Sequence, residues 1–195
     1  MKYLKYLLGV ITLFVLLFFG RGLLAPNVTY NSEITVDKPL AEAWAVANDE
    51  SKTTEWLKGL TKVEHVSGEK GAVGAVTQYT FVQDGQASII LETLKAIRPN
   101  EHVAMDFLME GVMAMDYQMD YSEKDGKTHI KSTTVAEGQG LFMRSIFAWT
   151  SSSMVAQEDE NLGNLKTVIE ANTTDYFPAP EITAEAVEEV VVGEE

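Results

Sequence analysis

The sequence predicts an α+β domain: an antiparallel sheet of about seven strands packed on a long C-terminal helix, preceded by a membrane-spanning helix. Three observations predict this arrangement. Residues 6–20 form an uncharged apolar run near the N-terminus. Between residues 60 and 137, apolar and polar residues alternate with the period of strands, and short turns separate the alternating stretches. From residue 141 to about residue 170 the apolar residues recur with the period of a helix.

Composition limits the classes of function. A length of 195 residues fits one ordinary domain with short extensions. The net charge of −14 argues against a nucleic-acid partner, because phosphate binding needs a surface of Lys and Arg. The absence of cysteine excludes disulfides, thiol nucleophiles, iron–sulfur clusters and cysteine zinc sites.

The apolar run reads YLLGVITLFVLLFFG, and as a helix it would reach roughly 22 Å, less than the ~30 Å hydrocarbon core. Extension through Ala25 gives a 20-residue span that ends at Pro26, so we expect residues 1–26 to be a membrane anchor. A cleaved signal peptide is the alternative, because two lysines precede the run.

The charges that flank the apolar run predict its orientation. Lys2 and Lys5 precede it and only Arg21 follows it, so the positive-inside rule places the domain on the extracytoplasmic side of a single-pass span.

The folded domain is expected to begin with a strand at residues 28–36, which is rich in β-branched residues. Pro39 then favours the start of a helix over 40–48, and a second short helix follows from Ser51 to a stop at Gly59.

Six further strands are expected, joined mostly by links of two to five residues, which indicates antiparallel hairpins and excludes a parallel sheet. Their ranges are 60–67, 76–83, 86–97, 101–110, 112–122 and 127–137. The long helix then runs from 141 to about 170, so the domain spans 27–172. Residues 173–195 are expected to be an acidic tail without regular structure, because they are rich in Glu, contain two prolines and lack bases.

Four segments carry a resemblance to a known family. They are ITVDKPLAEAWAVANDESKTTEW, GEKGAVGAVTQYTF, AIRPNEHVAMDF and ENLGNLKTVIEA. In this order they are similar to the opening strand and helix pair, the glycine hairpin, the strand elbow and the end of the long helix in the SRPBCC or START-like superfamily, also called polyketide cyclase/dehydrase and lipid-transport-like. The resemblance covers residues 28–171. It implies a helix-grip fold, in which the curved sheet wraps the long helix and encloses an apolar cavity.

The strand over 112–122 alternates sharply, with methionines and tyrosines on one face and Asp116, Gln118 and Asp120 on the other. With the preceding strand it supplies five methionines, whose flexible side chains suit a cavity for varied apolar ligands. Simple packing of the sheet on the helix is the alternative. The expected ligand-binding residues are Tyr79, Met105, Phe107, Met113, Met115, Tyr117, Met119, Phe142, Ile146 and Trp149.

Catalytic chemistry has fewer candidates. The alternation leaves open whether Glu92 and Asp106 face the cavity, where burial would raise the pKa of a carboxyl and suit it to acid–base work. Asp116 and Asp120 should face solvent. The three histidines, His65, His102 and His129, lie on different strands without metal-ligand spacing, so neither a metal nor a cofactor is expected.

Three functions remain open. The first is a membrane-anchored domain that binds a small hydrophobic or lipidic ligand. The second is a cyclase- or dehydratase-like enzyme that uses a cavity acid or base. The third is a co-chaperone-like interaction module. A buried carboxyl in the cavity would favour the enzyme, a purely apolar cavity the carrier, and an absent cavity the module. The sequence predicts no ligand identity and no oligomeric state.

Overall fold

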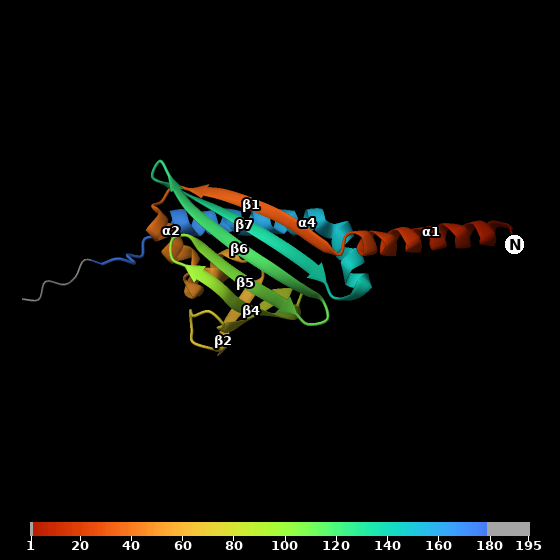
Figure 1. Ribbon diagram of the computed structural model, residues 1–195, viewed down its shortest axis with the longest axis horizontal. Helices are drawn as coiled ribbons and strands as arrows, with labels where there is room; N and C mark the ends of the chain where they lie inside the picture. The colour runs from red at the N-terminus through yellow and green to blue at the C-terminus, as the bar shows by residue number, and fades with distance from the viewer. Residues whose placement is uncertain (1, 179–195) are drawn as a thin grey trace, which may run out of the picture.

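The computed structural model describes residues 2–178. Seven antiparallel strands form one sheet in the order β1-β7-β6-β5-β4-β3-β2. This sheet curves around α4, while α1 projects away from the domain (Figure 1). The strands are β1 (Asn27–Val36), β2 (Leu60–Ser67), β3 (Val76–Gln83), β4 (Gln86–Arg98), β5 (His102–Met109), β6 (Met113–Lys124) and β7 (Lys127–Gly138). The helices are α1 (Lys2–Leu24), α2 (Leu40–Ala47), the 3-10 helix η1 (Glu50–Lys52), α3 (Thr53–Trp56) and α4 (Gly140–Glu170). The predicted α+β helix-grip fold is confirmed.

Local sequence explains where these elements begin and end. The β3–β4 and β6–β7 turns are the two-residue loops Asp84-Gly85 and Asp125-Gly126, and all four residues have positive φ angles of 50–79°. Such turns match the twist of a hairpin and favour Asp-Gly. The second short helix differs from expectation, because the Asp49 side chain accepts a hydrogen bond from the Ser51 amide and starts η1 before α3.

The core lies where α4 packs on the β1–β7 side of the sheet and on α2 and α3. Leu162, Leu165 and Ile169 of α4 are fully buried there, together with Val36 and Ile130. The other arm of the sheet, β3 to β6, borders a cavity that residues of η1, α3 and α4 also line. The fold therefore packs one arm of the sheet tightly and leaves space under the other.

A β-bulge in β4 decides which residues face that space. Leu94 pairs with Met105 and Ala96 pairs with Ala104, so Lys95 is the extra residue. A one-residue shift moves every following side chain to the opposite face. Because of the bulge, Glu92 lies opposite Phe107 on the inner face of the sheet.

The C-terminal segment returns to the domain after α4. Tyr176 packs against the core cluster and donates a hydrogen bond to Asp49 Oδ2 at 2.7 Å. Asn172 is buried beside it and bonds Glu42 through its side chain. The structure describes the predicted acidic tail, residues 173–195, as far as Pro178. Residues 179–195 lie outside the described residues.

Helix α1 is the one helix within residues 2–178 that is long and apolar enough to cross a membrane. By length and composition, an N-terminal helix of this kind could be a membrane span or a signal sequence. Its last turn contacts the first turns of α4.

Candidate ligand-binding site

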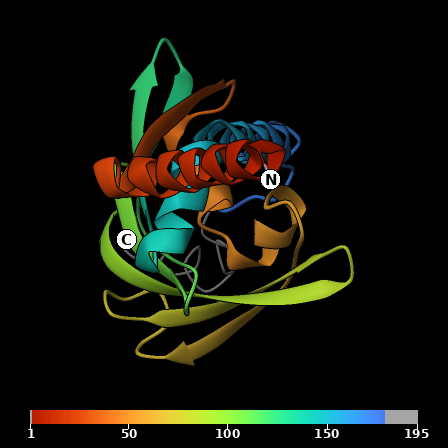
Figure 2. The same cartoon turned by 90° about the vertical axis from the view of Figure 1, so that its right-hand side faces the viewer.

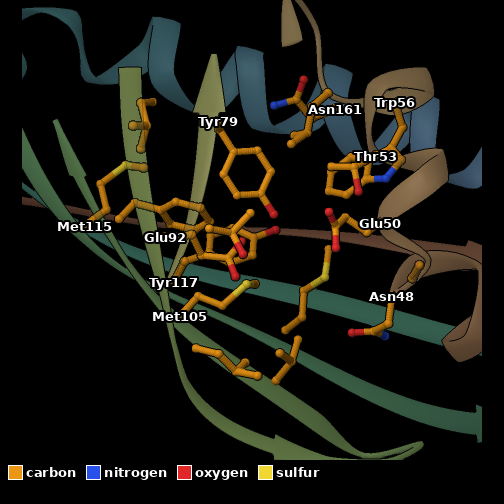
Figure 3. A pocket seen from close by; sticks show the side chains of 18 of the residues that line it. Asn48, Glu50, Thr53, Trp56, Tyr79, Glu92, Met105, Met115, Tyr117 and Asn161 are labelled. Atoms are coloured by element: carbon orange, nitrogen blue, oxygen red, sulfur yellow. The ribbon is translucent and has the colours of Figure 1, made fainter. Parts of the chain in front are cut away.

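A cavity of about 310 Å³ lies between α4 and the inner face of the sheet. Side chains from β3 to β6 form its floor, and residues of η1, α3 and α4 form its other walls (Figure 3). This volume is at the lower end of the range for small-molecule sites.

Six of the ten expected ligand-binding residues line this cavity. They are Tyr79, Met105, Phe107, Met115, Tyr117 and Met119. Strand register brings them together, because Met115 pairs with Phe107 and Tyr117 pairs with Met105. The packing interpretation holds for Met119, which is almost fully buried in the core cluster. The cavity interpretation suits Met115, which is half-buried beside free space.

The other four expected residues lie elsewhere. Met113 pairs with Met109 next to the β5–β6 turn, beyond the cavity wall. Phe142, Ile146 and Trp149 belong to the first turns of α4, which pack beside α1 instead of lining the cavity. Helical periodicity marked their apolar stripe but could not identify α1 as its neighbour.

Glu92 is the inward carboxyl that the sequence left open. Its side chain lines the cavity, and burial raises the pKa of the Glu92 carboxyl. A contact with the Tyr79 hydroxyl offsets part of that rise, and the nearby charge of Glu50 adds to it. Tyr79 can reach Glu92 because the two are diagonal neighbours, with Thr77 opposite Glu92 on the adjoining strand. In Figure 3 both side chains point into the same space.

Glu158 is a second cavity carboxyl, which the sequence analysis missed. It accepts a hydrogen bond from the Tyr117 hydroxyl at 2.9 Å, and burial raises the pKa of its carboxyl. Burial likewise raises the pKa of the Tyr117 hydroxyl. A signal for Glu158 was present, because it lies four residues before Leu162 and seven before Leu165 on the buried stripe of α4.

The rim of the cavity carries an ion pair. Lys70 Nζ lies 2.7 Å from Glu50 Oε2, so the pair joins η1 to the β2–β3 connection. Among the described residues that line the cavity, Lys70 is the sole base, whereas Glu50, Glu92 and Glu158 are acids. The site therefore offers no unpaired cation to an anionic ligand.

Two polar atoms of the wall, Trp56 Nε1 and Thr134 Oγ1, are buried without a hydrogen-bond partner within the described residues. Figure 3 shows the indole beside the cavity, next to Thr53. A buried donor without an acceptor costs free energy, which a ligand oxygen placed here would recover.

The remaining polar candidates lie outside the cavity. Asp106 and Asp116 both pair with Lys95 on the outer face, at 3.1 and 3.4 Å. Asp120 is exposed and accepts a hydrogen bond from His102. The ring of His65 lies near Gly68 O and that of His129 near Thr35 Oγ1. Within residues 2–178, no group of three or more His, Asp or Glu side chains is placed to hold a metal ion.

Comparison with known proteins gives one family match. The sequence model of the family described as "Polyketide cyclase / dehydrase and lipid transport" matches residues 27–170. The comparison with curated protein sequences gives no match.

Solved structures share the architecture at low sequence identity. Ara h 8.0201 is 19% identical with a TM-score of 0.60, covering 75% of this chain and 99% of its own. TTHA0849 from Thermus thermophilus is 14% identical with a TM-score of 0.63, covering 75% and 99% of the two chains. The Zhui aromatase/cyclase from Streptomyces sp. R1128 is 15% identical with a TM-score of 0.58, covering 76% and 99%. At these identities the likeness extends to the fold alone.

Proposed function

The chain belongs to the polyketide cyclase / dehydrase and lipid transport family, and from this premise we propose that its cavity binds a small, largely apolar, uncharged molecule while α1 holds the domain at a membrane. The observation that carries the proposal is the cavity itself. Methionine and aromatic side chains form most of its floor, and its polar groups converge from Glu92, Glu158 and Trp56. An apolar pocket with a few placed polar groups is the usual form of a small-molecule site.

The charges of the wall favour an uncharged ligand over a fatty-acid anion. Two buried carboxyls with raised pKa values face the cavity, and the one base of the described wall is engaged by Glu50. A protonated carboxyl or the Trp56 indole can donate to a hydroxyl or carbonyl oxygen. The burial that disfavours ionisation of Glu92 and Glu158 would equally disfavour a carboxylate ligand, which would find no compensating cation.

Contacts at the end of α1 support a retained anchor over a cleaved signal peptide. Arg21 Nε donates to Ala148 O at 2.9 Å, and Gly22 is buried against Ser145. A segment destined for removal has no need of such contacts. With α1 retained, the lysines at its start favour an extracytoplasmic domain, where the cavity lies close to the bilayer that would hold a sparingly soluble ligand.

Native mass spectrometry of the detergent-extracted full chain tests the ligand class. We expect a one-to-one complex with decanol and at least tenfold weaker occupancy with decanoate at pH 8. Met115→Trp, which fills the cavity, should remove decanol binding. Equal occupancy by decanoate, or decanol binding that survives Met115→Trp, would contradict the proposal. Retention of the full chain in the membrane pellet after carbonate washing tests the anchor.

Acid–base catalysis is a second candidate, because Glu92 and Glu158 are cavity carboxyls, each beside a tyrosine hydroxyl. Such a carboxylate could remove a proton from the carbon next to a ligand carbonyl, and solvent would return a proton to the resulting enolate. The test is deuterium exchange at the α-carbon of 2-decanone in heavy water, followed by NMR. Exchange accelerated 100-fold, and lost in Glu92→Gln or Glu158→Gln, would favour the enzyme. Exchange at the solvent rate would favour the carrier.

A further inference from the structure

The first turns of α4 carry a surface that the cavity does not use. Leu141, Phe142 and Trp149 are 39%, 59% and 52% exposed, although they are large apolar side chains. We call these three residues the shoulder. They lie beside the C-terminal part of α1, whose own apolar side chains are exposed along most of its length. Figure 2 shows α1 crossing in front of the first turns of α4.

Specific contacts hold the shoulder to α1. The rings of Phe18 and Phe142 lie 6.0 Å apart between centroids. The Arg21 guanidinium stacks over the Trp149 ring at 4.8 Å while its Nε donates to Ala148 O. These contacts join the last two turns of α1 to the domain, so the domain is not held by a free linker.

Gly22 makes this close approach possible. A Cβ at residue 22 would press on Ser145 Oγ and would lie 2.6 Å from Ser145 N and 2.8 Å from Ser145 Cα. Both distances are well inside van der Waals contact, and both involve backbone, which cannot easily move. A Cβ at Gly20, two residues earlier, would meet nothing within 4 Å. The two glycines therefore form a matched pair for testing the joint between α1 and α4.

We propose that the shoulder lies in the interfacial region of a lipid bilayer and fixes the orientation of the domain on the membrane. This inference rests on the proposed anchoring by α1. The 23 residues of α1 reach roughly 35 Å, enough to span the ~30 Å hydrocarbon core. Arg21 then lies near the end of the span, where arginine reaches the headgroups.

The contacts of α1 set the depth of the shoulder. Phe142 touches Phe18, which precedes Arg21 by three residues and so lies about 4–5 Å deeper along the helix. Trp149 lies at the level of Arg21 itself. Tryptophan is enriched at membrane interfaces because its ring is amphipathic. The apolar surface of the shoulder is thus continuous with the apolar surface of α1. Lipid that surrounds α1 would therefore also cover the shoulder.

The absence of cysteine allows each position to be labelled singly. The test places a nitroxide at Phe142→Cys and, as the control, at Val66→Cys, because Val66 is similarly exposed at 54% but lies on β2. The full chain is reconstituted in phosphatidylcholine nanodiscs that hold one copy each. We expect the label at residue 142 to be accessible to oxygen and protected from a water-soluble nickel relaxant, and the label at 66 to show the aqueous pattern. Gly22→Leu should reverse the pattern at residue 142, whereas Gly20→Leu should preserve it.

The outcomes separate the two proposals. If the chain is lost from membranes after carbonate washing, the proposed anchoring fails. If the chain is retained but residue 142 behaves like residue 66, the anchoring stands and the shoulder is overturned. Protection in vesicles that disappears in one-copy nanodiscs would show that a second copy of the chain covers the shoulder, which also overturns the inference. Phe142→Cys replaces an exposed side chain, and an unchanged thermal midpoint would confirm that the labelled chain is folded.

Discussion

The inner face of the sheet has two regions, one packed and one hollow. Under β1 and β7, side chains of α2 and α4 fill the space, and Val46, Leu165 and Ile130 are fully buried. Under β3 to β6, the same face meets a cavity, and Phe107 and Met115 are only half-buried. The difference shows that side chains fill the space under one arm of the sheet, while the space under the other arm stays open. Substitutions should therefore divide between loss of stability and loss of binding.

The largest effect is expected in the packed region. Leu165→Ala should reduce the free energy of unfolding by about 2–5 kcal/mol, because a fully buried leucine leaves a void that its neighbours cannot fill. Ile90→Ala, at the cavity wall, should cost less than half as much, since its side chain is half-buried and already borders free space. Thermal unfolding of the solubilised full chain measures both. Equal losses at the two positions would show that no cavity divides the face.

Enlarging two methionines of the same strand sharpens the comparison. Met119→Trp should cost roughly 1–3 kcal/mol, because Met119 lies in the core cluster. Met115→Trp should leave stability nearly unchanged while abolishing decanol binding, because the added ring enters the cavity. Asp116→Asn is the control, since Asp116 lies on the outer face and should affect neither property. Strong destabilisation by Met115→Trp with unaltered binding would contradict the cavity assignment.

The C-terminal segment extends the packed region. A chain ending at Asn172 should lose about 1–2 kcal/mol relative to one ending at Pro178, because it lacks Tyr176 and its hydrogen bond to Asp49. Tyr176→Phe in the full chain should lose part of this amount, since it keeps the ring and removes the hydroxyl. Identical melting of the two truncated chains would show that the contact of Tyr176 with the core contributes no stability.

The order of elements could be predicted because it depends on local signals. Periodicity of 2 or 3.6 and turn residues such as Asp84-Gly85 are read from neighbouring positions alone. Strand bounds accordingly agree with expectation to within one or two residues. Of the residues predicted from the strict alternation of β6, Met115, Tyr117 and Met119 line the cavity, whereas Met113 lies beyond its wall.

The parts that could not be predicted depend on long-range register and packing. The bulge at Lys95 turns Glu92 inward, and without it the β4–β5 register would place Glu92 opposite Leu108 on the outer face. In β4, Ile89, Ile90 and Leu91 are consecutive apolar residues, so the sequence does not indicate which of them face inward. Alternation therefore could not locate the bulge. The stripe containing Phe142 was likewise assigned to the cavity, because a helical period identifies an apolar face but not what covers it.

The smallest expected effect is a pH dependence that originates in the hollow region. Burial raises the pKa values of the Glu92 and Glu158 carboxyls above those of the unfolded chain, ~4.3 for glutamate. Between the unfolded and folded pKa values, the folded chain binds more protons, so stability falls as the pH rises through that window. Glu92→Gln and Glu158→Gln should each reduce this fall and stabilise the protein at pH 8 relative to pH 5.

The slope of thermal midpoint against pH from 5 to 8 measures this effect for each variant. Asp49 and Glu42 have lowered pKa values through hydrogen bonds to Ser51 and to Lys38, so their stabilisation is lost only under more acidic conditions and does not obscure the window. Glu101→Gln is the matched control, because its carboxyl is 70% exposed and is in water in both states. A slope that is the same in Glu92→Gln, Glu158→Gln and Glu101→Gln would mean that neither cavity carboxyl is buried in the folded protein. It would also remove the charge argument for an uncharged ligand, since that argument depends on carboxyls that resist ionisation inside the cavity.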